Sequence, residues 1–144
     1  MDLRQPDPRD GAFGGGGPVS GFNRLVLRAR TNVAQTDGSE PYPDLAPLSL
    51  DLPPNAAYAA ALSAARAMPL WQVTSEDPGA GRIAACATTP RMKFMDDVDI
   101  TIEPSGSGSR IHVRSASRVG ITDFGTNARR IRAYLARLAT NSPR

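Results

Sequence analysis

The residues best suited to chemistry lie in one stretch, 111–130, which reads IHVRSASRVGITDFGTNARR. Arginines, hydroxyls, a carboxylate and an amide crowd this stretch, between a strand-like pattern and a helix-like pattern. Guanidinium groups and free backbone amides at the start of a helix together attract an anion, and glycine lets the chain approach it closely. The predicted ligand-binding residues are Arg114, Ser115, Ser117, Arg118, Asp123, Gly125, Thr126 and Asn127.

The same stretch also has a purely structural interpretation. Asp123 would cap the turn, the two serines would bond to nearby backbone, and Arg118 would pair with Asp96 or Asp97. Buried or turn-forming polar groups need such partners whether or not a ligand binds. The sequence leaves both interpretations open.

Catalysis has little support in these residues. Ser115 or Ser117 would need His112 as a base, but His112 and Ser115 are an odd number of residues apart and point to opposite faces of a strand. Asp96 and Asp97 are adjacent, so they diverge on an extended chain and do not form an acid–base pair. We predict no catalytic residue; a hydrolase or transferase acting on an anionic substrate is the enzyme alternative.

The sequence offers few ligands for a metal or a redox group. Its single cysteine, Cys86, excludes an internal disulfide, and with the single histidine, His112, it leaves too few soft ligands for zinc. The acidic cluster 96–99 lacks the glycine-punctuated loop that binds calcium. We predict no metal site and no cofactor.

Charge and hydropathy limit the partners. The net charge is +3, and eight arginines face one acid, Asp123, from Arg110 onward, which favours an anionic partner. The chain is rich in alanine and has sixteen arginines against one lysine, a balance that is typical of genome composition. The arginines are therefore no evidence for a nucleic-acid partner, and we do not expect one. No apolar run is long enough to cross a bilayer, and early acids and glycines are atypical of a signal peptide. We predict a cytoplasmic protein without a transmembrane segment.

Proline and glycine divide the chain into three parts. Residues 1–21 form a flexible Gly/Pro-rich tail, residues 22–46 an extended arm, and residues 47–140 a single α+β domain. The tail could tether the domain, so a protein-interaction module docking on a larger assembly is a further alternative.

Periodicity predicts the elements of this domain. In order, they are a helix over 54–68, strands over 71–76 and 82–89, strands over 97–103 and 110–114, and a helix over 127–139. Thr126 or Asn127 would cap the last helix. The expected fold is two-layer α+β: a helix, two β-hairpins forming a four-stranded antiparallel sheet, and a helix. In the second hairpin the expected pairs are Glu103 with Arg110, Thr101 with His112, and Asp99 with Arg114.

Three segments carry a family resemblance. They are GRIAACATTPRMKF, the step Asp96-Asp97-Val98, and IHVRSASRVGITDFGTNARRIRAYLARL. Through them the chain resembles the bacterial and plastid family known as domain of unknown function 1499, over about 47–138. The family has no established activity. Relatives often carry a cysteine motif before the domain and an envelope anchor or signal; here the corresponding residues 31–36 read TNVAQT, so the resemblance does not carry an envelope role over.

Overall fold

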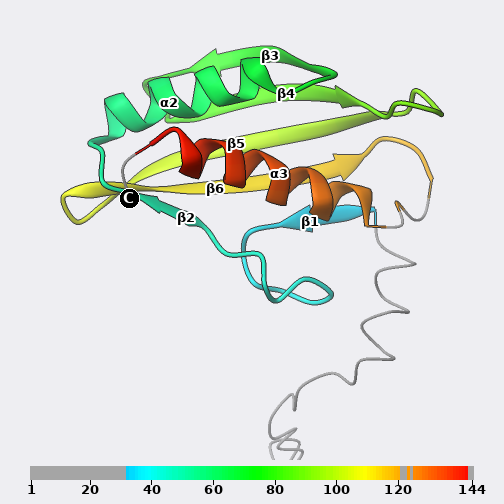
Figure 1. Cartoon of the computed structure of the whole chain (residues 1–144), viewed down its shortest axis with the longest axis horizontal. Coiled ribbons are helices and arrows are strands. Elements are labelled where there is room, and N and C mark those ends of the chain that lie inside the picture. Colours follow the sequence, from blue (N-terminus) through cyan, green and yellow to red (C-terminus); the bar gives the residue numbers. More distant parts are fainter. Residues whose placement is uncertain (1–31, 121–122, 124, 143–144) are drawn as a thin grey trace, which may run out of the picture.

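The described residues form an α+β fold of one antiparallel sheet and two helices (Figure 1). This computed structural model describes residues 32–120, 123 and 125–142. The predicted tail 1–21 and the start of the predicted arm therefore lie outside the described residues. The elements are β1 Val33–Gln35, β2 Leu48–Leu50, α2 Pro54–Ala67, β3 Trp71–Asp77, β4 Arg82–Thr88, β5 Met95–Ser105, β6 Gly108–Ser117 and α3 Thr126–Thr140.

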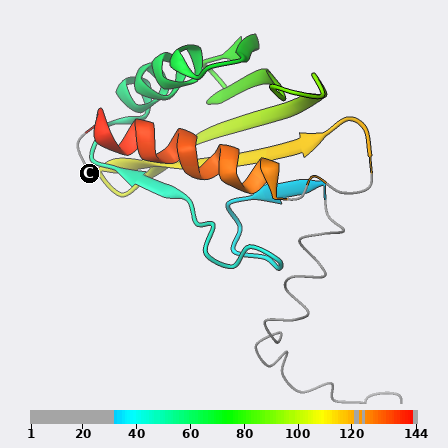
Figure 2. The same cartoon turned by 45° about the vertical axis from the view of Figure 1, so that its right-hand side comes forward.

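The sheet has six strands, so the predicted four-stranded sheet is wrong. Its order is β1-β6-β5-β4-β3, and β2 also pairs with β6. β1 and β2 lie end to end along the free edge of β6, with Val33–Gln35 opposite Arg114–Ala116 and Leu48–Leu50 opposite Ser109–Ile111 (Figure 2). β1 falls within the predicted extended arm. Three-residue strands between prolines show no period-two pattern, yet they satisfy the backbone groups of a long edge that would otherwise be open.

The register predicted for the second hairpin is confirmed. β5 and β6 pair Asp99 with Arg114, Thr101 with His112, and Glu103 with Arg110. Strict alternation between apolar and polar residues fixed this register, because a slip of one residue would move every apolar side chain to the wrong face. The two predicted helices and the first hairpin are also present, with ends that differ by at most one residue.

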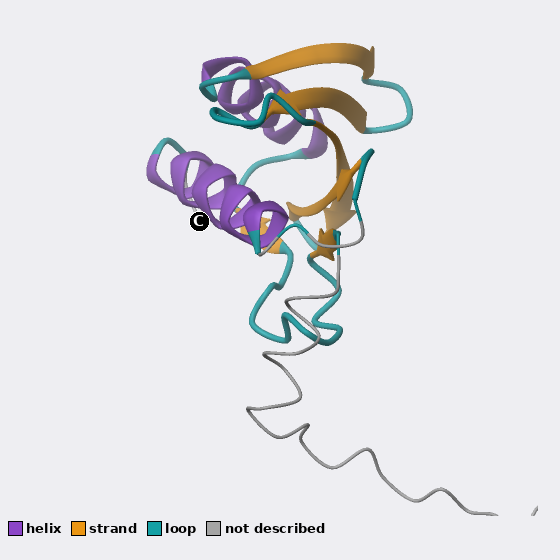
Figure 3. Cartoon of the chain, turned by 90° about the vertical axis from the view of Figure 1, so that its right-hand side faces the viewer, coloured by secondary structure: helices purple, strands orange, loops and turns teal. Residues whose placement is uncertain are grey.

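Both helices cover the same face of the sheet, here called the inner face (Figure 3). Ile83, Val98, Ile100, Ile111 and Val113 point into this layer and are buried. The alanines of α2 allow close approach to α3, and Tyr134 of α3 donates a hydrogen bond to the carbonyl of Ala61 at 2.8 Å. Burial raises the pKa of Tyr134, and its ring stacks on Trp71 at 5.3 Å between centroids. Tyr134 is fully buried in this layer, whereas its neighbour Leu135 is only partly buried.

The start of α3 differs from the prediction. Gly125 is its N-cap residue, with φ of 83°, and no side chain caps it from that position, so neither Thr126 nor Asn127 is the cap. Glycine suits this place because a left-handed φ is strained for residues with a Cβ atom. No described helix has the length and apolar character needed to span a bilayer.

Candidate functional site

The residues predicted to bind a ligand separate onto two faces of the sheet. Ser115 and Ser117 of β6 point to the inner face, where α3 brings Asn127 against them. Arg114 lines a hollow on the opposite, outer face and Arg118 pairs there with Asp97. Neither described helix packs on this face (Figure 3). Successive side chains of a strand alternate between faces, so one continuous polar run supplies two separate groups. The fold therefore does not bring the two arginines together with the start of α3.

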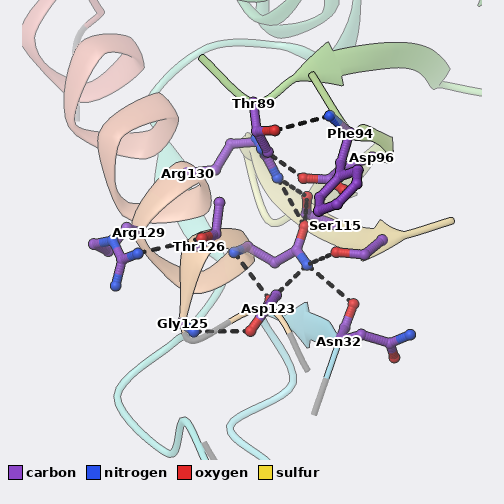
Figure 4. Close-up of polar contacts among 12 residues, drawn as sticks. Asn32, Thr89, Phe94, Asp96, Ser115, Asp123, Gly125, Thr126, Arg129 and Arg130 are labelled. Carbon is purple, nitrogen blue, oxygen red and sulfur yellow. Dashed lines mark hydrogen bonds and ion pairs between the residues drawn. The ribbon is translucent and has the colours of Figure 1, made fainter. Parts of the chain in front are cut away.

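Asn127 is the centre of a buried cluster on the inner face (Figure 4). Its side-chain oxygen accepts a hydrogen bond from Ser115 Oγ at 2.6 Å and another from Arg130 Nη1 at 2.7 Å. Its side-chain nitrogen donates to Ser117 Oγ at 2.9 Å and to the carbonyl of Asn32 at 3.0 Å. Asn127 thereby joins α3, β6 and the residue before β1.

Asp123 occupies the position that an anion would take at the start of α3. Its Oδ1 accepts the backbone N–H of Gly125 at 2.8 Å, and its Oδ2 accepts the backbone N–H of Asn127 at 3.1 Å. The backbone N–H of Thr126 donates to the carbonyl of Asp123 at 3.0 Å. A carboxylate of the chain itself thus meets the positive end of the helix dipole, as the structural interpretation expected.

A buried ion pair completes the inner cluster, and the sequence patterns did not assign it to the site. Arg130 Nη2 lies 2.7 Å from Asp96 Oδ2, with side chains 9% and 2% exposed. Arg130 Nη1 also donates to Ser115 Oγ at 3.1 Å. A signal was present: Asp96 has the same parity as the inward-facing Val98 and Ile100, and a charge at an inward position needs a buried partner.

Asp97, one residue further, makes the equivalent pair on the outer face. Arg118 Nη2 donates to Asp97 Oδ1 at 2.7 Å, and both side chains are nearly half exposed. Hydrogen bonds from Arg118 hold the pKa of Asp97 below its usual value. Of the two partners expected for Arg118, the structure selects Asp97.

Arg114 lines a hollow on the outer face together with Arg82 and His112. The hollow has a volume of about 280 Å³, and Thr101 and Asp99 of β5 lie between the two arginines. Within the described part of the chain, neither arginine side chain forms a hydrogen bond or an ion pair. His112 Nε2 lies 2.7 Å from Glu103 Oε1, and this contact lowers the pKa of Glu103.

The groups that a nucleophilic enzyme would need do not meet. Ser115 is fully buried and engaged with Asn127, whereas His112 lies on the outer face. Cys86 is buried on β4. Among the described residues, no three His, Cys, Asp or Glu side chains gather in a way that could hold a metal ion.

The fold defines a small two-layer α+β domain, in which both described helices pack on one face of an antiparallel sheet. The chain belongs to the family described as protein of unknown function (DUF1499), which matches residues 25–138, and the predicted family membership is confirmed. No curated protein matches the sequence.

Three solved structures are remotely similar. The crystal structure of Ara h 8.0201 has a TM-score of 0.47 and 10% identity, over 76% of this chain and 98% of that one. The protein TTHA0849 from Thermus thermophilus has a TM-score of 0.33 and 12% identity, over 73% and 86%. The KanY protein (ms6282) has a TM-score of 0.37 and 15% identity, over 78% and 96%. These similarities identify neither a ligand nor an activity.

Proposed function

We propose that the protein is a non-catalytic binding domain, and that the outer face of its sheet takes a small ligand carrying a carboxylate or phosphate group. One observation carries the proposal: Arg82 and Arg114 line the same hollow, and neither has an ionic partner among the described residues. Arginine presents a planar fork of donors that matches both kinds of anion.

The register brings the two arginines within reach of one ligand. Arg82 lies on β4 beside Thr101, and Arg114 lies on β6 beside Asp99, so one strand separates them. Two strand spacings and the two-residue offset along β5 combine to about 12 Å between the backbone positions, a distance that two arginine side chains can bridge around a bound anion. Ala84, which pairs with Asp99, leaves room above the sheet because its side chain is small.

The other side chains of the hollow limit the ligand further. Asp99 and Asp37 also line it, and they offer oxygens that accept hydrogen bonds. Asp37 accepts hydrogen bonds from Ser39 Oγ at 2.6 Å and from Ser39 N at 3.0 Å. These two bonds lower the pKa of Asp37, so its carboxylate is charged at neutral pH. Two arginines beside two carboxylates favour a ligand that combines an acidic group with a hydroxyl or amino group over a polyanion.

The test is calorimetric titration of the protein with inorganic phosphate and with a small hydroxy acid. The Arg114→Gln and Arg82→Gln variants should each weaken binding roughly tenfold, because each removes a charge-assisted hydrogen bond. Arg118→Gln is the matched control, since it removes an outer-face charge that is already paired with Asp97.

Two results would contradict the proposal. Either no saturable binding is found to any small carboxylate or phosphate compound, or binding survives unchanged in the Arg82→Gln/Arg114→Gln double variant. An equal loss in Arg118→Gln would place the anion near Asp97 instead of in the hollow.

A further inference from the structure

The exposed apolar side chains of the domain gather at one end of the sheet. Among the described residues, the exposed large apolar side chains are Leu70, Met92, Phe94, Met95 and Val119, at 43% to 67% exposure. Backbone contacts connect their segments: Thr88, which pairs with Met95, donates to the carbonyl of Leu70, and Arg118, which precedes Val119, donates to the carbonyl of Met95. We call these five residues the apolar rim.

The loop between β4 and β5 forms the tip of this rim. Figure 1 shows that it reaches beyond the end of α2 and the start of α3. Its sequence from Arg91 to Met95 reads RMKFM, so basic and apolar side chains alternate, and all five residues are exposed. Such alternation lets apolar groups enter an apolar layer while the cations stay at its polar surface.

The tip carries two cations, Arg91 and Lys93. Neither Arg91 nor Lys93 forms a side-chain hydrogen bond or an ion pair within the described residues. The acids next to the loop are already neutralised, because Asp96 pairs with Arg130 and Asp97 pairs with Arg118. The rim therefore combines exposed apolar area with uncompensated positive charge.

Hydrogen bonds within the loop connect its two ends. Thr89 N donates to the carbonyl of Phe94 at 2.9 Å, and Phe94 N donates to Thr89 Oγ1 at 2.9 Å, as Figure 4 shows for the second contact. Lys93, with φ of 54°, donates its N–H to the carbonyl of Thr89 at 3.1 Å. Polar backbone groups that lose water must find internal partners, so this closure reduces the cost of burying the tip.

We propose that the apolar rim docks on a membrane surface that contains anionic lipids. Met92 and Phe94 would enter the interface, and Arg91 and Lys93 would bind lipid phosphates or carboxylates at its surface. A projecting tip with alternating cations fits a bilayer interface better than the concave apolar pocket of a protein partner. This inference is independent of the hollow on the outer face.

Vesicle sedimentation of the full chain tests the proposal. Binding is expected on phosphatidylcholine vesicles that contain phosphatidylglycerol, with much less on phosphatidylcholine alone. Arg91→Gln/Lys93→Gln and Met92→Ser/Phe94→Ser should each weaken binding roughly tenfold or more. As a control, Arg110→Gln removes a positive charge at the opposite end of the sheet, where Arg110 lies opposite Glu103, and should bind like the unchanged protein. Circular dichroism checks that each variant is folded.

A local probe separates docking by the rim from docking by another part of the chain. In a Cys86→Ser background, an environment-sensitive fluorophore on Met92→Cys should shift to the blue on anionic vesicles. The same fluorophore on Ser107→Cys, in the turn between β5 and β6, should not shift. The proposal is overturned if the chain does not sediment with anionic vesicles, if the loop variants bind unchanged, or if both probes respond alike. Binding of an acidic protein without vesicle binding would assign the rim to a protein partner.

Discussion

Asp96 and Asp97 are neighbours on β5, and each forms an ion pair with an arginine at 2.7 Å. The pair on the inner face, with Arg130, is 2% and 9% exposed; the pair on the outer face, with Arg118, is about half exposed. The two ion pairs have the same length, but the difference in burial changes how much the loss of one member costs in stability. Removing one member of a buried pair leaves an uncompensated charge, whereas an exposed pair contributes little because water screens it.

The same contrast applies to the rest of β6. Ser115 serves the inner cluster around Asn127, while the adjacent Arg114 faces an open hollow. Ser115, Asn127 and Arg130 hydrogen-bond to one another and join α3 to the sheet, which is a structural task. On the outer face, Arg82 and Arg114 form no side-chain hydrogen bond or ion pair with the other described residues. Polar residues one position apart therefore have different roles, and the contrast between the two faces leads to four predictions.

The largest effect is expected from Asp96→Asn, which leaves Arg130 charged and buried without a carboxylate. The free energy of unfolding should fall by about 3–5 kcal/mol, as measured by urea denaturation. Asp97→Asn is the matched control and should cost no more than about 1 kcal/mol. Equal losses in the two variants would remove the distinction between the two faces.

Asn127→Ala should be the next most damaging change. It deprives Ser115 and Arg130 of an acceptor and the carbonyl of Asn32 of a donor, which should cost about 1–3 kcal/mol. Thr126→Ala, at the adjacent position, should change stability by less than about 0.5 kcal/mol, because its hydroxyl accepts only an exposed contact from Arg129. Thermal unfolding of both variants checks the difference, and a tolerant Asn127 would contradict the structural role of the cluster.

Arg114→Gln should leave stability within about 0.5 kcal/mol of the unchanged protein, since the side chain is exposed and has no ionic partner to lose among the described residues. Its effect should instead appear in anion binding. Parallel urea denaturation and calorimetry separate the two quantities. A large loss of stability would make Arg114 a structural residue, like its neighbour Ser115.

The smallest effect concerns the pKa of Asp97. Arg118→Gln should return it toward its ordinary value of 3.8, because hydrogen bonds from Arg118 are the main cause of the lowering. Since the folded-state pKa is lowered, the contribution of the pair to stability is present above about pH 4 and is lost as pH falls through the lowered pKa. Carboxyl NMR titration measures the change, and Arg114→Gln should raise this pKa less. An unchanged pKa in Arg118→Gln would show that the exposed pair does not form in solution.

Sequence patterns predicted the elements whose signals are long and regular. Alternation over residues 97–103 and 110–114 gave the hairpin and its pairs, and the helices followed from alanine content and apolar spacing. β1 and β2 were not predicted, because a three-residue strand is too short to show a periodic pattern and is defined by its pairing with β6. Tyr134 was missed because the sequence does not reveal that Trp71 and Ala61 will surround it.

By itself, the sequence determined that Arg114 and Ser115 face opposite ways, because side-chain direction in a strand is a local property. Only the tertiary structure decided which face α3 would cover. Packing of its apolar stripe against the inner face buried Asn127 with Ser115 and gave Asp96 the partner Arg130. The tertiary structure also places Asp123 at the start of α3 and places Arg82 and Arg114 around one hollow on the outer face. These outcomes depend on contacts between residues distant in the chain, which local periodicity does not encode.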